Sequence, residues 1–109
     1  MTYEKILSIL KPWHDAMQEC DARMDALSDL CGPVDESPLG NAVFGLMGDY
    51  TKTIASAIDW DHAALEDWWC SHNFGERSMS IRLCGEPFRE ISTIEQLAQL
   101  IADDHAKAG

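Results

Sequence analysis

The sequence predicts a mainly helical α+β fold: an antiparallel helical hairpin, a short third helix, a small C-terminal β-hairpin and a final helix. Two observations support this fold class. Apolar residues recur every three or four positions through most of the first 60 residues, which is typical of amphipathic helices. Near Met79 the period changes to two, which indicates a half-buried strand. With 109 residues, 46% of them hydrophobic, the chain fits one domain, with the helical hairpin in 1–60 and the other elements in 61–109.

The first apolar stripe predicts a long helix that packs along its whole length. Its members follow one another at alternating steps of four and three, as in heptad a and d positions. They are Ile6, Leu10, Trp13, Met17, Cys20, Met24, Leu27 and Cys31. Pro12 has no backbone N–H, so we expect a short helix over Tyr3–Leu10 and a main helix over Pro12–Leu30. Cys31-Gly32-Pro33 should end it, because glycine suits the position after a helix.

The second helix should begin at Ser37, which fits an N-cap, with Pro38 at the first helical position. A second stripe predicts its buried face, formed by Leu39, Val43, Leu46, Tyr50, Ile54 and Ala57. The glycines within this pattern, Gly40, Gly45 and Gly48, are interpreted as positions of close helix packing. Two amphipathic helices joined by a short loop predict an antiparallel hairpin.

The third helix should begin after Asp59-Trp60-Asp61 and end at Asn73-Phe74-Gly75. Its apolar face is formed by Leu65, Trp68, Trp69 and His72. We expect Trp13 and Trp68 in the core and Trp60 as a hydrophobic staple. Trp68 and Trp69 diverge by about 100° on a helix, so we expect Trp69 to be partly exposed.

The C-terminal part predicts two strands and a capped helix. Phe88-Arg89-Glu90-Ile91 should pair with the first strand after a turn at Gly85-Glu86-Pro87. This hairpin is expected to pack on the helices through Met79, Ile81, Leu83 and Phe88. Ser92 and Glu95 fit a capping box, Ile94, Leu97, Ala98 and Ile101 give the buried face of the final helix, and residues 105–109 should fray.

Charge narrows the classes of partner. The chain carries a net charge of −11, and the span Trp13–Asp67 holds twelve acidic and two basic residues, a net of −10. Such a field disfavours direct binding of nucleic acid or of anionic membranes, because both need Lys and Arg. It favours a basic protein surface. The start of the chain lacks a signal h-region and no stretch is long enough to span a bilayer, so we expect a cytoplasmic protein without a membrane partner.

The residue types that support catalysis or metal binding are present without the spacing that such sites need. Cys70 could pair with His72 or His62 as a nucleophile, but it lies near a helix C-terminus beside Glu66 and Asp67, which disfavours a thiolate. The zinc alternative would use His62, Cys70, His72 and Cys84, in which no pair has a metal-binding spacing. Glycine-rich phosphate loops are absent. We therefore expect no catalytic residues, no metal and no cofactor, so the chain is interpreted as a non-enzyme.

Three segments in the C-terminal half carry a resemblance to known proteins. They are Leu65-Glu66-Asp67-Trp68, Asn73-Phe74-Gly75 and Ile91-Ser92-Thr93-Ile94-Glu95-Gln96-Leu97. Together they resemble small accessory proteins encoded by phages and prophages. The resemblance implies an intracellular product of a mobile element that interferes with host proteins, and it implies no catalytic residues.

The main functional hypothesis is an acidic, non-enzymatic protein-binding module that docks on a basic surface of a host protein. It could act as a nucleic-acid mimic or as an inhibitor of a host defence or nucleic-acid-handling factor. The expected partner-binding residues are Asp15, Glu19, Asp21, Asp25, Asp29, Glu66 and Trp69. A simpler reading of the acids is a solvated helix face. The alternative function is a homo-oligomeric structural or assembly protein, with the first stripe paired between two copies as a homodimer. A small hydrolase or metalloprotein is the third hypothesis.

Overall fold

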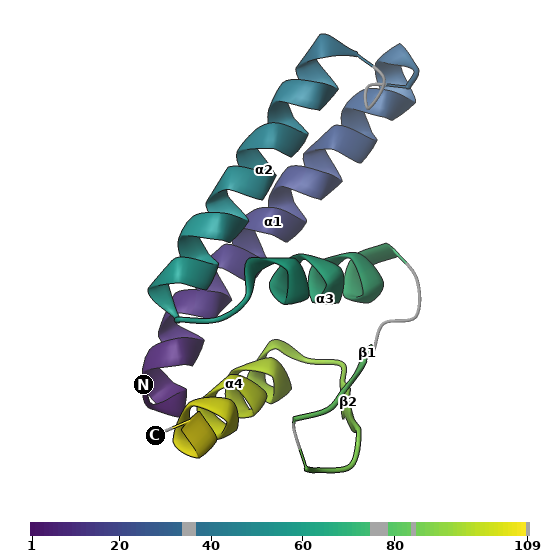
Figure 1. The fold of residues 1–109 in the computed structure, drawn as a ribbon. Coiled ribbons are helices and arrows are strands. Elements are labelled where there is room, and N and C mark those ends of the chain that lie inside the picture. Colours follow the sequence, from purple (N-terminus) through teal and green to yellow (C-terminus); the bar gives the residue numbers. More distant parts are fainter. Residues whose placement is uncertain (34–36, 75–78, 84, 109) are drawn as a thin grey trace.

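The computed structural model describes residues 1–33, 37–74, 79–83 and 85–108, without the side chains of 72–74 and 108. Within these residues the order is α1 (Tyr3–Cys31), α2 (Pro38–Ala57), α3 (His62–Phe74), β1 (Met79–Ile81), β2 (Arg89–Ile91) and α4 (Ile94–Ala108). Helices α1 and α2 form a long antiparallel hairpin (Figure 1). Helix α3 crosses the hairpin, and α4 packs beside the N-terminal turns of α1, close to where both termini lie. The predicted mainly helical fold with a small β-hairpin is confirmed.

Helix α1 is continuous through Pro12, so the expected break after Leu10 is wrong. The side chains before and after the proline both enter the core: Leu10 and Trp13 are fully buried. Burial on both sides keeps the axis helical, although Pro12 cannot donate a hydrogen bond to the carbonyl of Ser8. Ser8 and Pro12 are exposed, so water can reach the carbonyl of Ser8. At the other end Gly32 has a φ of 83° and its N–H binds the carbonyl of Ser28 at 2.9 Å.

The buried face of α2 lies one position further along the chain than the stripe predicted. Ser37 caps the helix as expected, accepting a hydrogen bond from the amide of Gly40 at 3.1 Å. The residues that are buried on this helix are Gly40, Thr51, Ile54 and Ala55. By contrast, Leu39, Leu46 and Tyr50 are exposed. Of the predicted stripe, Ile54 is buried and Val43 is half-buried, whereas Gly40, Thr51 and Ala55 are buried outside it.

One hydrogen bond explains the orientation of α2. The indole Nε1 of Trp13 on α1 donates to Thr51 Oγ1 at 3.1 Å, and this hydroxyl donates to the carbonyl of Met47 at 2.8 Å. A buried indole N–H needs an acceptor, and Thr51 supplies one only if its side chain faces α1. The glycine interpretation is wrong for Gly45 and Gly48, because a Cβ at either position would meet no atom within 4 Å.

Helix α3 begins as predicted, with Asp61 Oδ2 accepting from the amide of Ala64 at 3.3 Å. Both of its adjacent tryptophans are buried, so the expected partial exposure of Trp69 is wrong. The reason is that α3 is covered on two sides. Trp68 donates its indole N–H to the carbonyl of Ile91 at 3.1 Å, and Trp69 packs edge-on against Trp13 at 6.0 Å between ring centroids.

The predicted β-hairpin is confirmed, with antiparallel pairs Met79–Ile91, Ser80–Glu90 and Ile81–Arg89. Met79 and Ile81 are partly buried against the core and Leu83 is buried. The expectation that Phe88 packs on the helices is wrong, because 65% of the residue is exposed. The Arg82 guanidinium lies 5.1 Å from the centroid of its ring.

Helix α4 is capped one residue later than expected. Thr93 Oγ1 accepts from the amide of Gln96 at 3.1 Å, and Gln96 Oε1 accepts from the amides of Thr93 and Ser92 at 3.2 and 2.7 Å. The expected Ser92–Glu95 box is therefore wrong, because glutamine takes the reciprocal role. The predicted buried face is confirmed by Ile94, Leu97, Ala98 and Ile101.

The expected fraying of residues 105–109 is wrong for 105–108, since α4 continues to Ala108, and Gly109 lies outside the described residues. Tertiary contacts hold its last turns. The Nε2 atom of His105 lies 2.9 Å from the carbonyl oxygen of Asp59, which precedes α3 and has a φ of 51°. Lys107 Nζ lies 3.6 Å from Glu86 in the turn between the strands. These contacts join the end of α4 to two loops.

Candidate functional site

The predicted acidic face of α1 is accessible along most of its length. Asp15, Glu19, Asp25 and Asp29 are exposed, and the side chains of Asp15 and Glu19 are 68% and 65% exposed. Glu19 Oε1 accepts a hydrogen bond from Arg23 Nη2 at 2.7 Å, one turn further along. Such an exposed i,i+4 pair contributes little to stability. The Asp15 Oδ1 atom lies 3.7 Å from His14 Nδ1. All four carboxylates are nevertheless exposed enough to reach a partner.

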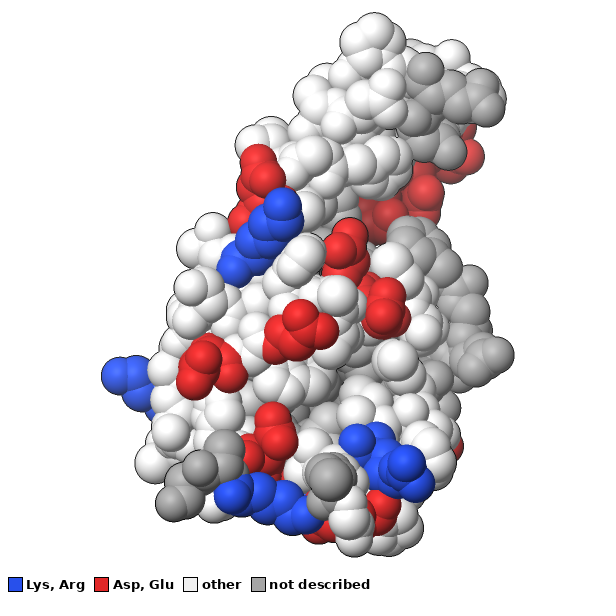
Figure 2. Space-filling model, in the orientation of Figure 1, with Lys and Arg blue, Asp and Glu red and all other residues white. Residues whose placement is uncertain are grey.

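Asp21 occupies a different position from the other acids of this set. It is half-buried and takes part in an interaction, so it lies on the flank of α1 rather than on its outer side. This follows from the helical geometry, because Asp21 stands only about 60° from the buried stripe around Met24. Figure 2 shows carboxylates across the middle of one face, where α3 crosses the hairpin, and along its upper right edge.

Glu66 and Trp69, the two predicted partner-binding residues of α3, have different environments. The Glu66 side chain is 53% exposed, and its Oε2 lies 3.6 Å from His62 Nε2. Trp69 is only 3% exposed and packs among Trp13 and His14. Trp69 therefore cannot serve as an exposed anchor, whereas Glu66 can reach a partner.

Glu66 and Trp69 nevertheless line one cleft, which lies where α3 meets the α1–α2 hairpin. Its volume is about 140 Å³, and Met17, Phe44 and Met47 contribute to its lining together with these two residues. The remaining lining residues are Gly48, Thr51 and Cys70. Phe44 is 41% exposed at this cleft, although the sequence pattern did not assign it a role. The signal that could have found it is an aromatic residue one turn before a glycine on a helix with few charges.

Large apolar side chains are also exposed on the hairpin. Leu30, Leu39 and Leu46 are 84%, 54% and 69% exposed, and Tyr50 is 37% exposed. Helix α2 contains one acid, Asp49, and one base, Lys52, whereas the chain as a whole has a net charge of −11. The exposed side of α2 is thus nearly neutral and includes large apolar side chains, whereas α1 carries the row of acids.

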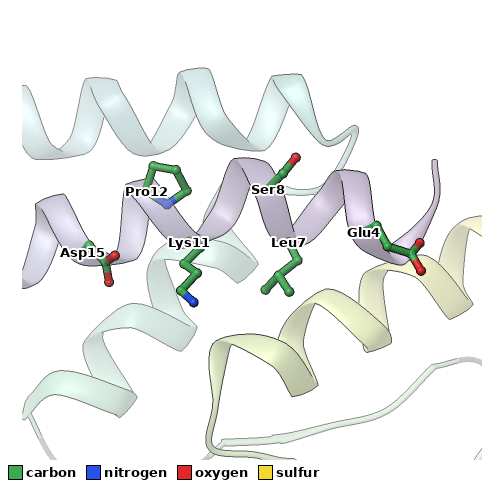
Figure 3. Close-up of a pocket in the computed structure, with 6 residues that line it drawn as sticks. All are labelled: Glu4, Leu7, Ser8, Lys11, Pro12 and Asp15. Carbon is green, nitrogen blue, oxygen red and sulfur yellow. The ribbon is translucent and has the colours of Figure 1, made fainter.

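A shallow hollow lies on the N-terminal half of α1. It is lined by Glu4, Leu7, Ser8, Lys11, Pro12 and Asp15, with a volume of about 540 Å³ (Figure 3). Leu7 and Lys11 point toward α3 and α4, whereas Ser8 and Pro12 point the other way. The lining side chains diverge and carry both signs of charge, so they do not converge on a common point as catalytic groups would.

Cysteine chemistry gains no support from the environment of Cys70. Partial burial raises the pKa of the Cys70 thiol, and the carboxylates of Glu66 and Asp67 raise it further. A raised pKa disfavours the thiolate that a nucleophile or metal ligand requires. The proposed partner His72 has a side chain outside the described part, and Cys84 lies outside the described residues. Among the residues that are described, no group of three or more His, Cys, Asp or Glu is placed to hold a metal ion.

The best-defined polar cluster joins the β-hairpin to α4. Arg89 Nη1 donates to Asp103 Oδ2 at 2.6 Å, and Gln99 Nε2 donates to Asp103 Oδ1 at 2.9 Å. The hydrogen bond from Arg89 lowers the pKa of Asp103, with a second contribution from Gln99. The carboxylate is therefore held as the ionised partner of a structural ion pair. This cluster joins α4 to the β-hairpin and does not resemble an acid–base pair for catalysis.

Comparisons with models of protein families, with curated proteins and with solved structures found no match. Across the described ranges, no helix combines the length and the apolar composition that crossing a lipid bilayer requires.

Proposed function

We propose that this chain is a non-enzymatic binding module, encoded by a phage or prophage, that docks on a basic surface of a host protein. The observation that carries the proposal is the row of exposed aspartates and glutamate on α1. Asp15 and Asp29 are separated by fourteen positions, which corresponds to about 21 Å along the helix. Such a surface would attract a basic protein and steer it into contact.

The spacing of these acids favours general charge complementarity over close mimicry of nucleic acid. Acids that step by four residues lie about 6 Å apart along the axis. Phosphates follow one another at roughly 3.4 Å per strand in duplex DNA. The acidic side of α1 is thus less densely charged than a nucleic-acid strand, and the proposal is docking on a basic protein groove rather than replacement of a bound duplex.

The energetic cost of the acidic row also supports a binding role. Asp21, Asp25 and Asp29 follow at intervals of four, where like charges destabilise a helix by roughly 0.2–0.5 kcal/mol per pair. No basic residue lies between Asp25 and Asp29 in the sequence. A surface that served only solubility could alternate charges and avoid this cost. A basic partner would remove the repulsion on binding.

The test is capture of proteins from host lysate by the immobilised chain, at low and at high ionic strength. We compare wild type with Asp25→Asn/Asp29→Asn, and with Asp49→Asn/Glu95→Gln, which removes the same charge elsewhere. We expect a retained basic protein that is released by salt and lost in the first variant only. Equal retention by both variants, or retention that ignores salt, would contradict the proposal.

A second candidate function is a homodimer, and the exposed apolar side chains of α2 favour it. The stripe of α1 that was expected to pair between two copies is occupied within the chain from Ile6 to Met17. The exposed Leu39, Leu46 and Tyr50 make α2 the surface that could pair instead. Light scattering over a range of concentrations tests this directly. A monomer at every concentration would eliminate it, and a dimer that Leu46→Lys abolishes would support it.

A further inference from the structure

We propose that the cleft between α3 and the α1–α2 hairpin receives one apolar side chain of a basic segment of the partner. This inference rests on the proposed function and specifies where and how the partner is read. The occupant is an extended or helical segment in which a Leu, Met or Phe stands next to Lys or Arg.

The size of the cleft fits a single side chain. Its volume is about 140 Å³. An apolar cavity of about 150 Å³ is large enough to hold benzene, so this space suits the end of one Leu, Met or Phe side chain. Met17 and Met47 lie on its walls, and methionine is an adaptable lining because its thioether is flexible and polarisable.

The inner surface of the cleft favours an apolar occupant. Thr51 contributes the hydroxyl there, and that group already accepts from Trp13 Nε1 and donates to the carbonyl of Met47. The hydroxyl proton of Thr51 is therefore already used, and a hydrogen-bond acceptor on the occupant would lose water without gaining a donor there. Trp69 and Phe44 present aromatic surface, and Phe44 is exposed enough to be covered by a bound chain.

The rim of the cleft supplies the charge that selects a basic neighbour. The Glu66 side chain lines the cleft and is 53% exposed. Asp67 follows it and is also exposed. Lys or Arg next to the apolar anchor would find a carboxylate within reach, whereas an acidic segment would be repelled. The net charge of −11 on a second copy of this chain would oppose its approach to this acidic rim, so the proposed occupant is a basic partner.

The glycines of α2 provide a matched pair of variants. Gly48 lines the cleft, and a Cβ at this position would meet no atom within 4 Å, so we expect Gly48→Leu to fill part of the space. Gly45 is equally open but is not among the residues that line the cleft. Both changes replace glycine in a helix interior, so both should raise the melting temperature.

The experiment follows the methionine methyl signals by NMR during titration with two capped peptides at low ionic strength. One is Lys-Lys-Leu-Lys-Lys and the other is Lys-Lys-Gly-Lys-Lys. We expect the leucine peptide to shift Met17 and Met47 but not Met24 or Met79, which lie outside the cleft, and the glycine peptide to leave all four unchanged. Gly48→Leu should weaken binding of the leucine peptide about tenfold or more, and Gly45→Leu should not.

The controls separate this inference from the proposed function. Glu66→Gln should weaken binding of the leucine peptide mainly at low salt. Unchanged Met17 and Met47 signals, equal shifts with both peptides, or unaltered binding to Gly48→Leu would each overturn the cleft as the anchor site. Capture of a basic host protein that is lost in Asp25→Asn/Asp29→Asn would still support the proposed function in that case. Failure of that capture, with methyl shifts intact, would overturn the proposed function instead.

Discussion

The indole of Trp13 donates to the hydroxyl of Thr51 at 3.1 Å, and this bond joins α1 to α2 inside the core. Both residues are buried, with exposed fractions of 0% and 1%. The bond holds the side of α2 that carries Thr51 against α1. As a consequence Leu39, Leu46 and Tyr50 are exposed on the other side of the helix.

Thr51→Val should destabilise the protein, because valine keeps the shape but leaves the buried Trp13 N–H without its acceptor. We expect a loss of about 1–3 kcal/mol in the free energy of unfolding, measured with denaturant. Thr53→Val on the exposed side of the same helix is the control and should change stability by less than about 0.5 kcal/mol. Equal losses in the free energy of unfolding for the two variants would show that the Trp13–Thr51 hydrogen bond does not stabilise the fold.

Pro12→Ala should stabilise the protein, because alanine restores the hydrogen bond to the carbonyl of Ser8 in a continuous helix. Proline in a helix interior costs about 3 kcal/mol relative to alanine, and its stiffening of the unfolded chain offsets about 0.4–1 kcal/mol of that cost. We therefore expect a gain of roughly 2–2.6 kcal/mol by thermal or denaturant unfolding. Lys11→Ala, at the neighbouring exposed position, should have little effect. A loss of stability in Pro12→Ala would mean that the proline conformation is required.

The ion pair of Asp103 with Arg89 predicts a specific dependence of stability on pH. Because Arg89 lowers the pKa of Asp103 in the folded state, the pair stabilises fully above the ordinary aspartate pKa of about 3.9. Its contribution is lost as the pH falls through the lower folded pKa. The pair is partly exposed, so we expect only about 0.5–1 kcal/mol. Asp103→Asn should lower the free energy of unfolding at neutral pH and match wild type at strongly acidic pH. A constant difference at all pH values would contradict this.

Asp25→Lys should raise stability while it weakens binding. Lysine at this position faces Asp21 and Asp29 at i,i+4 spacing and replaces two repulsions by two attractions of about 0.2–0.5 kcal/mol each. We expect a small rise in melting temperature together with a loss of partner capture. Ala22→Lys on the same helix adds the same type of charge without removing an acid and serves as the comparison. A variant that gains stability and keeps full capture would indicate a solubilising role for the acids.

Apolar spacing predicted the helical segments and the strands, although the break expected at Pro12 and the Ser92–Glu95 cap were wrong. Gly32 marks the C-terminal end of α1 and Ser37 the start of α2. The alternation of apolar and polar residues from Met79 to Ile81 indicates the first strand of the pair. The rotation of α2 could not be predicted, because it depends on a hydrogen bond between residues 38 positions apart. Likewise, the burial of Trp69 depends on α3 crossing the hairpin, which no local pattern encodes.

The candidate site was predictable only in part. Asp15, Glu19, Asp25 and Asp29 are exposed because they lie away from the apolar stripe of α1, whereas Asp21 lies close to that stripe and is half-buried. The cleft was not predictable, since it joins Met17, Phe44 and Glu66 from three helices. Periodicity also assigned no role to Phe44, because it lies outside the expected stripe of α2.

The most direct test of the central proposal is the dissociation constant of the captured host protein, measured against ionic strength for wild type and the two double variants. We expect the affinity of wild type to fall steeply with salt. Asp25→Asn/Asp29→Asn should bind more weakly at low salt and lose affinity less steeply, while Asp49→Asn/Glu95→Gln follows wild type. Identical salt dependence in all three proteins would contradict the acidic side of α1 as the docking surface.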